Sequence, residues 1–201
     1  MAIPQNEPDR CGLSWACKVV ASGVFLTGRE AQEIFNFSCN WMAAPEALMR
    51  QVLETRDPTA ILELPIGINV DHDTETVRLE LNGIEAFARR FGDQGCMVLD
   101  DPQMQPAFRP APVVPNPVQD DFEPEGSIAP DQAASTGLDP AALDAALELA
   151  FENPMHFTNA MLVVHKGKVV AERYREPFGP DTQFESWSMG KRIAATLVGV
   201  A

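Results

Sequence analysis

The chain is poor in basic side chains. Its 201 residues contain 15 lysines and arginines against 29 aspartates and glutamates, which gives a formal net charge of −14 at pH 7. A surface of this sign repels phosphate groups, so the composition argues against nucleic-acid binding and against attachment to an anionic membrane. We therefore expect neither as a partner, and the composition does not fix the oligomeric state.

The sequence also lacks clustered metal ligands. The four cysteines, Cys11, Cys17, Cys39 and Cys96, are irregularly spaced and form no Cys-x-x-Cys pair, whereas a zinc site needs ligands grouped at short spacings. We expect four buried or free thiols. Disulfides are the alternative if the protein is exported.

Two further groups of polar residues are candidate metal ligands. The run DHDTE at residues 71–75 favours a solvated acidic turn over a calcium site, because calcium takes six or more oxygens and the EF-hand pattern is absent. His72 and His156 are expected in exposed loops. His165 is expected at the surface, beside a turn, rather than as a metal ligand or base.

No targeting segment or membrane span is evident. Residues 1–10, MAIPQNEPDR, carry neither a basic n-region nor an apolar core. The apolar run VVASGVFL at residues 19–26 is too short to cross a bilayer. We expect a soluble chain, cytoplasmic by default, while a missing upstream start would leave a periplasmic location open.

Composition divides the chain into three parts. Residues 1–100 are expected to form a small α+β accessory region. Residues 101–137 hold eight of the 17 prolines, which indicates an extended linker, with a proline-rich ligand for a partner domain as the alternative. Regular patterning returns at residues 138–201. The fold class predicted for the whole is a mixed one, α+β or α/β.

Local patterns predict the elements of the first part. Helices are expected to start at REAQEIFNF and over PEALMRQVLETR, where Pro45 suits the first turn. A hairpin is predicted from LPIGINV to TVRLEL, which places Val77, Leu79 and Leu81 on one face. GIEAFARRF is predicted to be a short amphipathic helix, and CMVL a buried strand.

The last part has its own order of elements. DPAALDAALELAFE predicts a helix with Asp139 as N-cap and Pro140 in its first position. AMLVVH, KGK and VVAERY predict a strand, a tight turn and a second strand. A loop follows, and a helix is predicted from about Ser188 onward.

Ser188 and Lys191 begin this helix and share one face, since residues three apart are neighbours on a helix. A serine is a nucleophile when a base takes its proton, and a lysine can be that base when burial and the helix dipole lower its pKa. The following IAATLVGVA is apolar all round, which predicts a central buried helix and a partly desolvated Lys191. The alternative is a capping serine beside an exposed lysine, because a bare Ser-x-x-Lys is weak evidence.

The segment Leu138–Ala201 resembles the start of the transpeptidase-like fold of serine β-lactamases and penicillin-binding proteins. The order helix, hairpin, loop and Ser-x-x-Lys helix is the context which that motif requires. The sequence VVHKGKVVAERY, followed by SWSMGK, is most similar to the branch of 6-aminohexanoate-dimer hydrolases, esterases and class C β-lactamases. Residues 17–35 and 66–100 resemble the accessory N-terminal region of some bacterial members.

The resemblance implies that Ser188 is the acyl-forming nucleophile, that Lys191 helps to deprotonate it, and that the Ser188 backbone N–H is half of an oxyanion hole. The expected substrate is a small amide or ester, with no metal or organic cofactor. Arg192 stands where the family has Ser or Thr, and Tyr174 precedes the nucleophile and does not match the family's later tyrosine. Trp187 is left open between core packing and the lining of a substrate cleft.

The family's later Tyr and Lys/His motifs do not occur in these 201 residues. We therefore expect the N-terminal part of a larger serine hydrolase domain that is inactive by itself. The alternative is a catalytically incompetent chain that acts as a binding or structural module.

Overall fold

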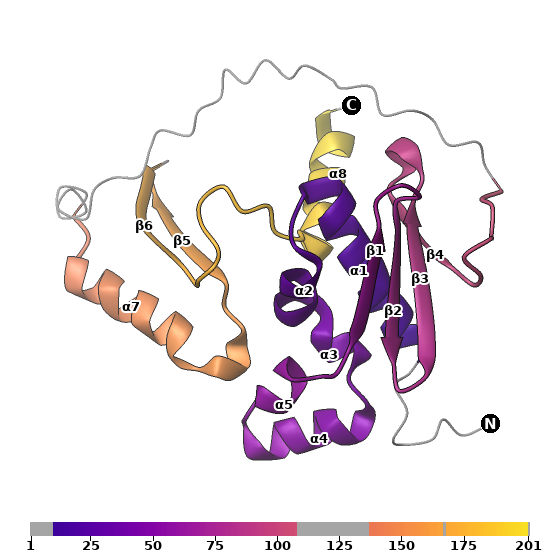
Figure 1. Cartoon of the computed structure of the whole chain (residues 1–201). Helices are drawn as coiled ribbons and strands as arrows, with labels where there is room; N and C mark the ends of the chain where they lie inside the picture. The colour runs from indigo at the N-terminus through magenta and orange to yellow at the C-terminus, as the bar shows by residue number, and fades with distance from the viewer. Residues whose placement is uncertain (1–9, 108–136, 167, 201) are drawn as a thin grey trace.

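The computed structural model describes residues 10–107, 137–166 and 168–200. The chain is mixed α+β, as predicted, with a four-stranded antiparallel sheet in its first part and a two-stranded hairpin in its last part (Figure 1). Residues 108–136, which make up most of the predicted linker, lie outside the described residues.

The larger sheet has the order β1-β2-β3-β4 and consists of neighbouring hairpins. The strands are β1 (Gly67–Asp71), β2 (Thr76–Leu81), β3 (Ile84–Arg90) and β4 (Cys96–Leu99). The predicted hairpin is confirmed, since β1 pairs with β2 and the side chains of Val77, Leu79 and Leu81 are all buried. CMVL forms β4, also as predicted.

The prediction of a helix over GIEAFARRF is wrong, because this segment is strand β3. Asn82 and Gly83 join β2 to β3 with φ values of 53° and 80°, the left-handed conformation that an Asn-Gly hairpin turn requires. Ala86 and Ala88 then face the core, two residues apart. The Asn-Gly turn and pairing with two neighbouring strands outweigh the helical spacing of the apolar residues.

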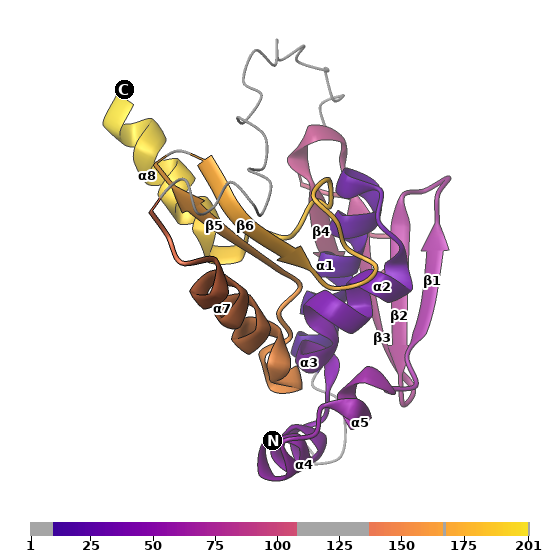
Figure 2. The ribbon, with the colours of Figure 1, turned by 90° about the vertical axis from the view of Figure 1, so that its left-hand side faces the viewer.

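Helix α1 (Arg10–Thr27) lies against one face of this sheet (Figure 2). Its buried face consists of Leu13, Ala16, Cys17, Val20, Ala21 and Gly23. The small side chains let the helix approach β2 and β3 closely, so that the thiol of Cys17 donates to the carbonyls of Val77 and Ala86, each at 3.4 Å. The apolar run at residues 19–26 is therefore part of a core helix.

A series of short helices connects α1 to the sheet. They are α2 (Ala31–Ile34), the π-helix η1 (Phe35–Cys39), α3 (Asn40–Ala43), α4 (Glu46–Thr55) and α5 (Thr59–Leu62); the 3₁₀ turn η2 (Gly92–Gln94) precedes β4. The two helices predicted near residues 29 and 45 are confirmed as α2 and α4. Gly28, at φ 68°, reverses the chain after α1 and places Arg29 at the start of this segment.

The last part begins with α7 (Pro140–Glu152) and the 3₁₀ turn η4 (Pro154–His156), followed by β5 (Ala160–His165) and β6 (Lys168–Tyr174). The predicted cap is confirmed: the Asp139 side chain accepts a hydrogen bond of 2.9 Å from the Ala141 N–H. An ion pair of 2.9 Å between Glu148 and Arg173 connects α7 to β6.

After β6 the chain runs through a loop into the 3₁₀ turn η5 (Trp187–Met189) and helix α8 (Gly190–Val200). In Figure 2, α8 projects away from the larger sheet and from α1. The loop itself returns to the first part of the molecule, and this contact determines what surrounds Ser188.

Candidate active site

Ser188 and Lys191 are brought together as their spacing predicts. Ser188 lies in η5, and Lys191 lies in the first turn of α8. The Lys191 Nζ donates a hydrogen bond of 2.8 Å to the Ser188 Oγ. The amine is therefore within proton-transfer distance of the hydroxyl that the sequence singles out as a nucleophile.

The predicted burial around this pair is wrong for the part of the chain that the structure describes. Ser188 and Lys191 are both exposed, and so are the side chains at positions 192–199. Ile193, Leu197 and Val198 are among the large apolar residues that face solvent. The apolar character of α8 shows that the helix needs cover on all sides, but no described element supplies it.

Glu185 ties the loop before the nucleophile to the first part of the chain. Its carboxylate accepts a hydrogen bond of 2.9 Å from Arg29 and another of 2.9 Å from the Ser38 hydroxyl. Arg29 also pairs with Glu33, and its side chain is only 7% exposed. Burial disfavours the charged guanidinium, but the hydrogen bonds and charges of both carboxylates outweigh that cost and hold the pKa of Arg29 above its ordinary value.

Aromatic rings also pack in this contact between the loop before Ser188 and the first part of the chain. Phe178, which is buried, packs edge-on against Phe37 at 5.3 Å and against Phe184 at 5.2 Å between ring centroids. The Arg29 guanidinium lies over Phe178 and Phe184, 5.6 and 5.9 Å from their centroids. The Asn159 amide adds a hydrogen bond to the Phe37 carbonyl. The loop that carries Ser188 is thus anchored on α2 and η1.

A pocket of about 390 Å³ lies where this loop meets α1 and α3. It is lined by Cys11, Gly12, Trp15, Trp41, Met42 and Trp187. These include all three tryptophans of the chain. Trp187, which directly precedes Ser188, is half exposed and lines this pocket, so of the two roles weighed for it the structure favours the lining of a surface hollow over core packing.

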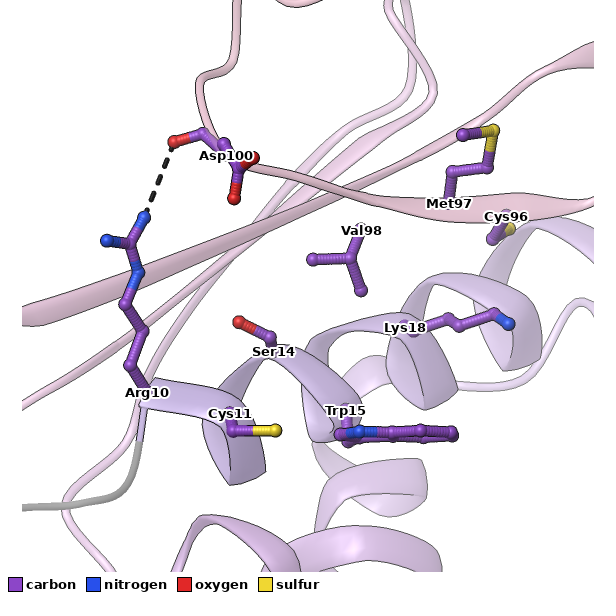
Figure 3. A pocket seen from close by; sticks show the side chains of 9 residues that line it. All are labelled: Arg10, Cys11, Ser14, Trp15, Lys18, Cys96, Met97, Val98 and Asp100. Carbon is purple, nitrogen blue, oxygen red and sulfur yellow. Dashed lines mark hydrogen bonds between the residues drawn. The ribbon is translucent and has the colours of Figure 1, made fainter. Parts of the chain in front are cut away.

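A second hollow of about 660 Å³ runs between α1 and β4 (Figure 3). It shares Cys11 and Trp15 with the tryptophan pocket. Charged residues of both signs line it: Lys18, Asp100, and Arg10, whose guanidinium donates to the Asp100 carbonyl at 3.5 Å. The two hollows are therefore adjacent along α1, and among the described residues only the second is lined by Asp, Lys or Arg.

The remaining candidates lie apart from one another. His72 and His156 are exposed, as predicted, and His165 lies at the end of β5. Asp71 accepts hydrogen bonds from the backbone N–H groups of Asp73 and Thr74, which hold the pKa of its carboxyl below the ordinary value. Within residues 10–107, 137–166 and 168–200, the structure contains no group of three His, Cys, Asp or Glu side chains that could hold a metal ion.

The four cysteines and the tyrosine complete the list of reactive groups. All four cysteines fall within the described residues and none forms a disulfide; three are buried, and Cys11 is exposed. Tyr174 lies on β6 and donates a hydrogen bond of 2.9 Å to Glu172. It thus precedes the nucleophile on the hairpin, as the sequence indicates.

No family model, curated protein or solved structure matches this chain. Within the described residues, no helix combines the length and the apolar character that are needed to cross a bilayer.

Sequence reasoning missed four residues that shape the site: Arg29, Glu185, Trp15 and Trp41. Arg29 and Glu185 are 156 positions apart, so no spacing rule relates them. For Trp15 and Trp41 the one available signal is residue type, because tryptophan is enriched at interfaces where part of the ring stays in contact with water.

Proposed function

We propose that this chain supplies the nucleophile and the activating lysine of a serine hydrolase that cleaves an amide or ester bond through an acyl-enzyme on Ser188. The observation that carries the proposal is the 2.8 Å hydrogen bond between Lys191 Nζ and Ser188 Oγ. The Ser-x-x-Lys spacing in the sequence indicates the same two residues.

The proposed reaction has two balanced steps. The Lys191 amine takes the Ser188 proton while Oγ bonds to the substrate carbonyl carbon; the proton then goes to the leaving amine or alcohol as its bond to that carbon breaks. A water molecule next attacks the acyl-enzyme, gives up one proton, and releases the carboxylic acid while Ser188 regains its hydrogen. This chemistry needs no metal or organic cofactor.

The order of elements is a second support. Helix α7, the hairpin β5–β6, a loop and the helix opening with Ser-x-x-Lys follow one another as in the transpeptidase-like proteins that this segment resembles. In that family, backbone N–H groups at the start of the nucleophile helix stabilise the oxyanion. By this resemblance, the Ser188 N–H would do the same here.

A second candidate function is a non-catalytic binding or structural module. The observation in its favour is the exposure of Ser188 and Lys191 together with Ile193, Leu197 and Val198. An exposed apolar helix is typical of a surface that packs against another polypeptide segment. In this case Ser188 and Lys191 would only form the start of the helix and would have no catalytic role.

Covalent labelling separates the two candidates. The natural polypeptide that contains these residues is treated with a fluorescent alkyl fluorophosphonate, and the labelled peptide is identified by mass spectrometry. We expect the label on Ser188. Ser188→Ala should abolish labelling, whereas the matched variant Ser186→Ala, which changes an exposed serine two residues earlier, should retain it. Absence of labelling in the wild type, or a label on another residue, would contradict the proposed hydrolase.

A further inference from the structure

The three tryptophans of the chain surround one pocket although they come from three separate elements. Trp15 belongs to α1, Trp41 to α3 and Trp187 to η5. Their exposed fractions are 53%, 52% and 50%. A large apolar ring is stabilised by removing its surface from water. Three half-exposed rings around a single hollow leave apolar surface that a ligand would cover.

The lining of this pocket selects the charge of the ligand. Its other residues are Cys11, Gly12 and Met42, so among the residues that the structure describes no Asp, Glu, Lys, Arg or His side chain lines it. A charged ligand group would lose its hydration without gaining an ionic partner. The neighbouring hollow differs, because charged residues of both signs, Arg10, Lys18 and Asp100, line it. An uncharged group therefore fits the tryptophan pocket.

Volume and position connect this pocket to the proposed chemistry. The hollow has a volume of about 390 Å³ and is wide open to solvent, so a small flat group would lie against the rings rather than be enclosed. Trp187 lines the pocket and directly precedes Ser188 in the chain, so the Cα atoms of these two residues are about 3.8 Å apart. Trp187 also has φ 44°, a left-handed conformation that is uncommon for a bulky residue. The Arg29–Glu185 ion pair holds the same loop against α2.

We propose that Trp15, Trp41 and Trp187 form the binding site for an uncharged, flat apolar group, of the kind that an aryl ester or aryl amide carries beside its carbonyl. The ligand class follows from the pocket itself, and its role as part of a substrate rests on the proposed function. In this arrangement the first part of the chain supplies two of the three rings that select the substrate.

Binding is tested with N-phenyl-1-naphthylamine, a neutral aromatic probe that brightens in apolar surroundings. Because all three tryptophans line the pocket, excitation of tryptophan should transfer energy to the bound probe. We expect Trp41→Ala and Trp187→Leu each to weaken binding by about tenfold or more, since each removes one ring surface. Lys18→Ala, which alters only the adjacent hollow, and Ser188→Ala should bind like the wild type.

Two variants are used so that misfolding of one of them cannot be mistaken for a loss of probe binding. Trp187 lies in a loop turn and Trp41 in α3, and the melting temperature of each variant is compared with that of the wild type. No binding of the probe to the wild type, or unchanged binding in both tryptophan variants when they are folded, would overturn the proposal.

The link to the substrate is tested on the natural polypeptide by comparing an aryl and a methyl fluorophosphonate at Ser188. Trp41→Ala should slow labelling by the aryl reagent about tenfold or more, and leave the methyl reagent unchanged. Equal slowing of both reagents would contradict a selective role. If neither reagent labels Ser188 in the wild type, the proposed hydrolase fails, while the naphthylamine measurement still decides whether the pocket binds a neutral aromatic group.

Discussion

The Nη1 of Arg29 lies 2.9 Å from the Oε1 of Glu185, and this ion pair joins residues that are 156 positions apart. Glu185 precedes the candidate nucleophile by three residues, and Arg29 directly follows the turn after α1. One buried cation therefore determines how the loop that carries Ser188 sits on the first part of the molecule.

We expect Arg29→Met to lower the free energy of unfolding by about 3 kcal/mol or more, because it leaves the carboxylates of Glu33 and Glu185 without their partner in a partly buried site. Chemical denaturation measures this loss. The control is Arg50→Met, which removes an i,i+4 pair with Glu46 whose side chains are 66% and 69% exposed. Such a surface pair contributes about 0.5 kcal/mol or less, so losses of similar size in both variants would contradict the importance assigned to Arg29.

Replacing Lys191 tests its role as the base. If Lys191 takes the proton from Ser188, Lys191→Ala should slow fluorophosphonate labelling of Ser188 by about 100-fold or more. The matched variant is Arg192→Ala, which removes the neighbouring exposed cation of α8 and should change the rate by less than about threefold. The second-order labelling rate is measured in the natural polypeptide. A Lys191→Ala rate equal to that of the wild type would show that the lysine only caps the helix start.

Cys17 predicts a pH dependence of stability. Burial raises the pKa of its thiol from 9.0 to about 12. Between these values the unfolded chain has lost the proton and the folded chain has kept it, so the stabilising contribution is complete below about pH 9 and is lost as the pH rises toward 12. The wild type should therefore lose up to about 1.4 kcal/mol per pH unit more than Cys17→Ala in this range.

Urea denaturation at pH 8, 9.5 and 10.5 gives this difference. The other buried thiols titrate in both proteins, so they largely cancel in the comparison. Parallel losses of stability in the wild type and in Cys17→Ala would show that the Cys17 thiol ionises as easily in the folded chain as in the unfolded one.

The turn between β2 and β3 makes a fourth prediction. Gly83→Ala should lower the free energy of unfolding by about 1 kcal/mol, because φ is 80° at this position and alanine is strained there. No atom lies within 4 Å of the added Cβ, so the effect is one of backbone conformation alone. Gly179→Ala is the control, since its Cβ also meets nothing within 4 Å and its φ is not positive. Thermal unfolding of both variants checks the difference.

Local sequence patterns predicted the elements that depend on local interactions. The Asp139 cap, the hairpins β1–β2 and β5–β6, and the Ser188–Lys191 spacing all involve residues near one another in the chain, and the structure contains each of them. The exception is β3, where the spacing of apolar residues predicts a helix although Asn82-Gly83 is a hairpin signal. The turn, and not the spacing, agrees with the structure.

The surroundings of the candidate site were decided by tertiary structure. The sequence by itself determined that Ser188 and Lys191 share a helical face, because the geometry of one helical turn fixes that distance. Only the tertiary structure showed that Arg29 anchors Glu185, and that Trp15 and Trp41 come to lie beside Trp187. Contacts between distant segments depend on how whole elements pack, and such packing leaves no periodic signal in the chain.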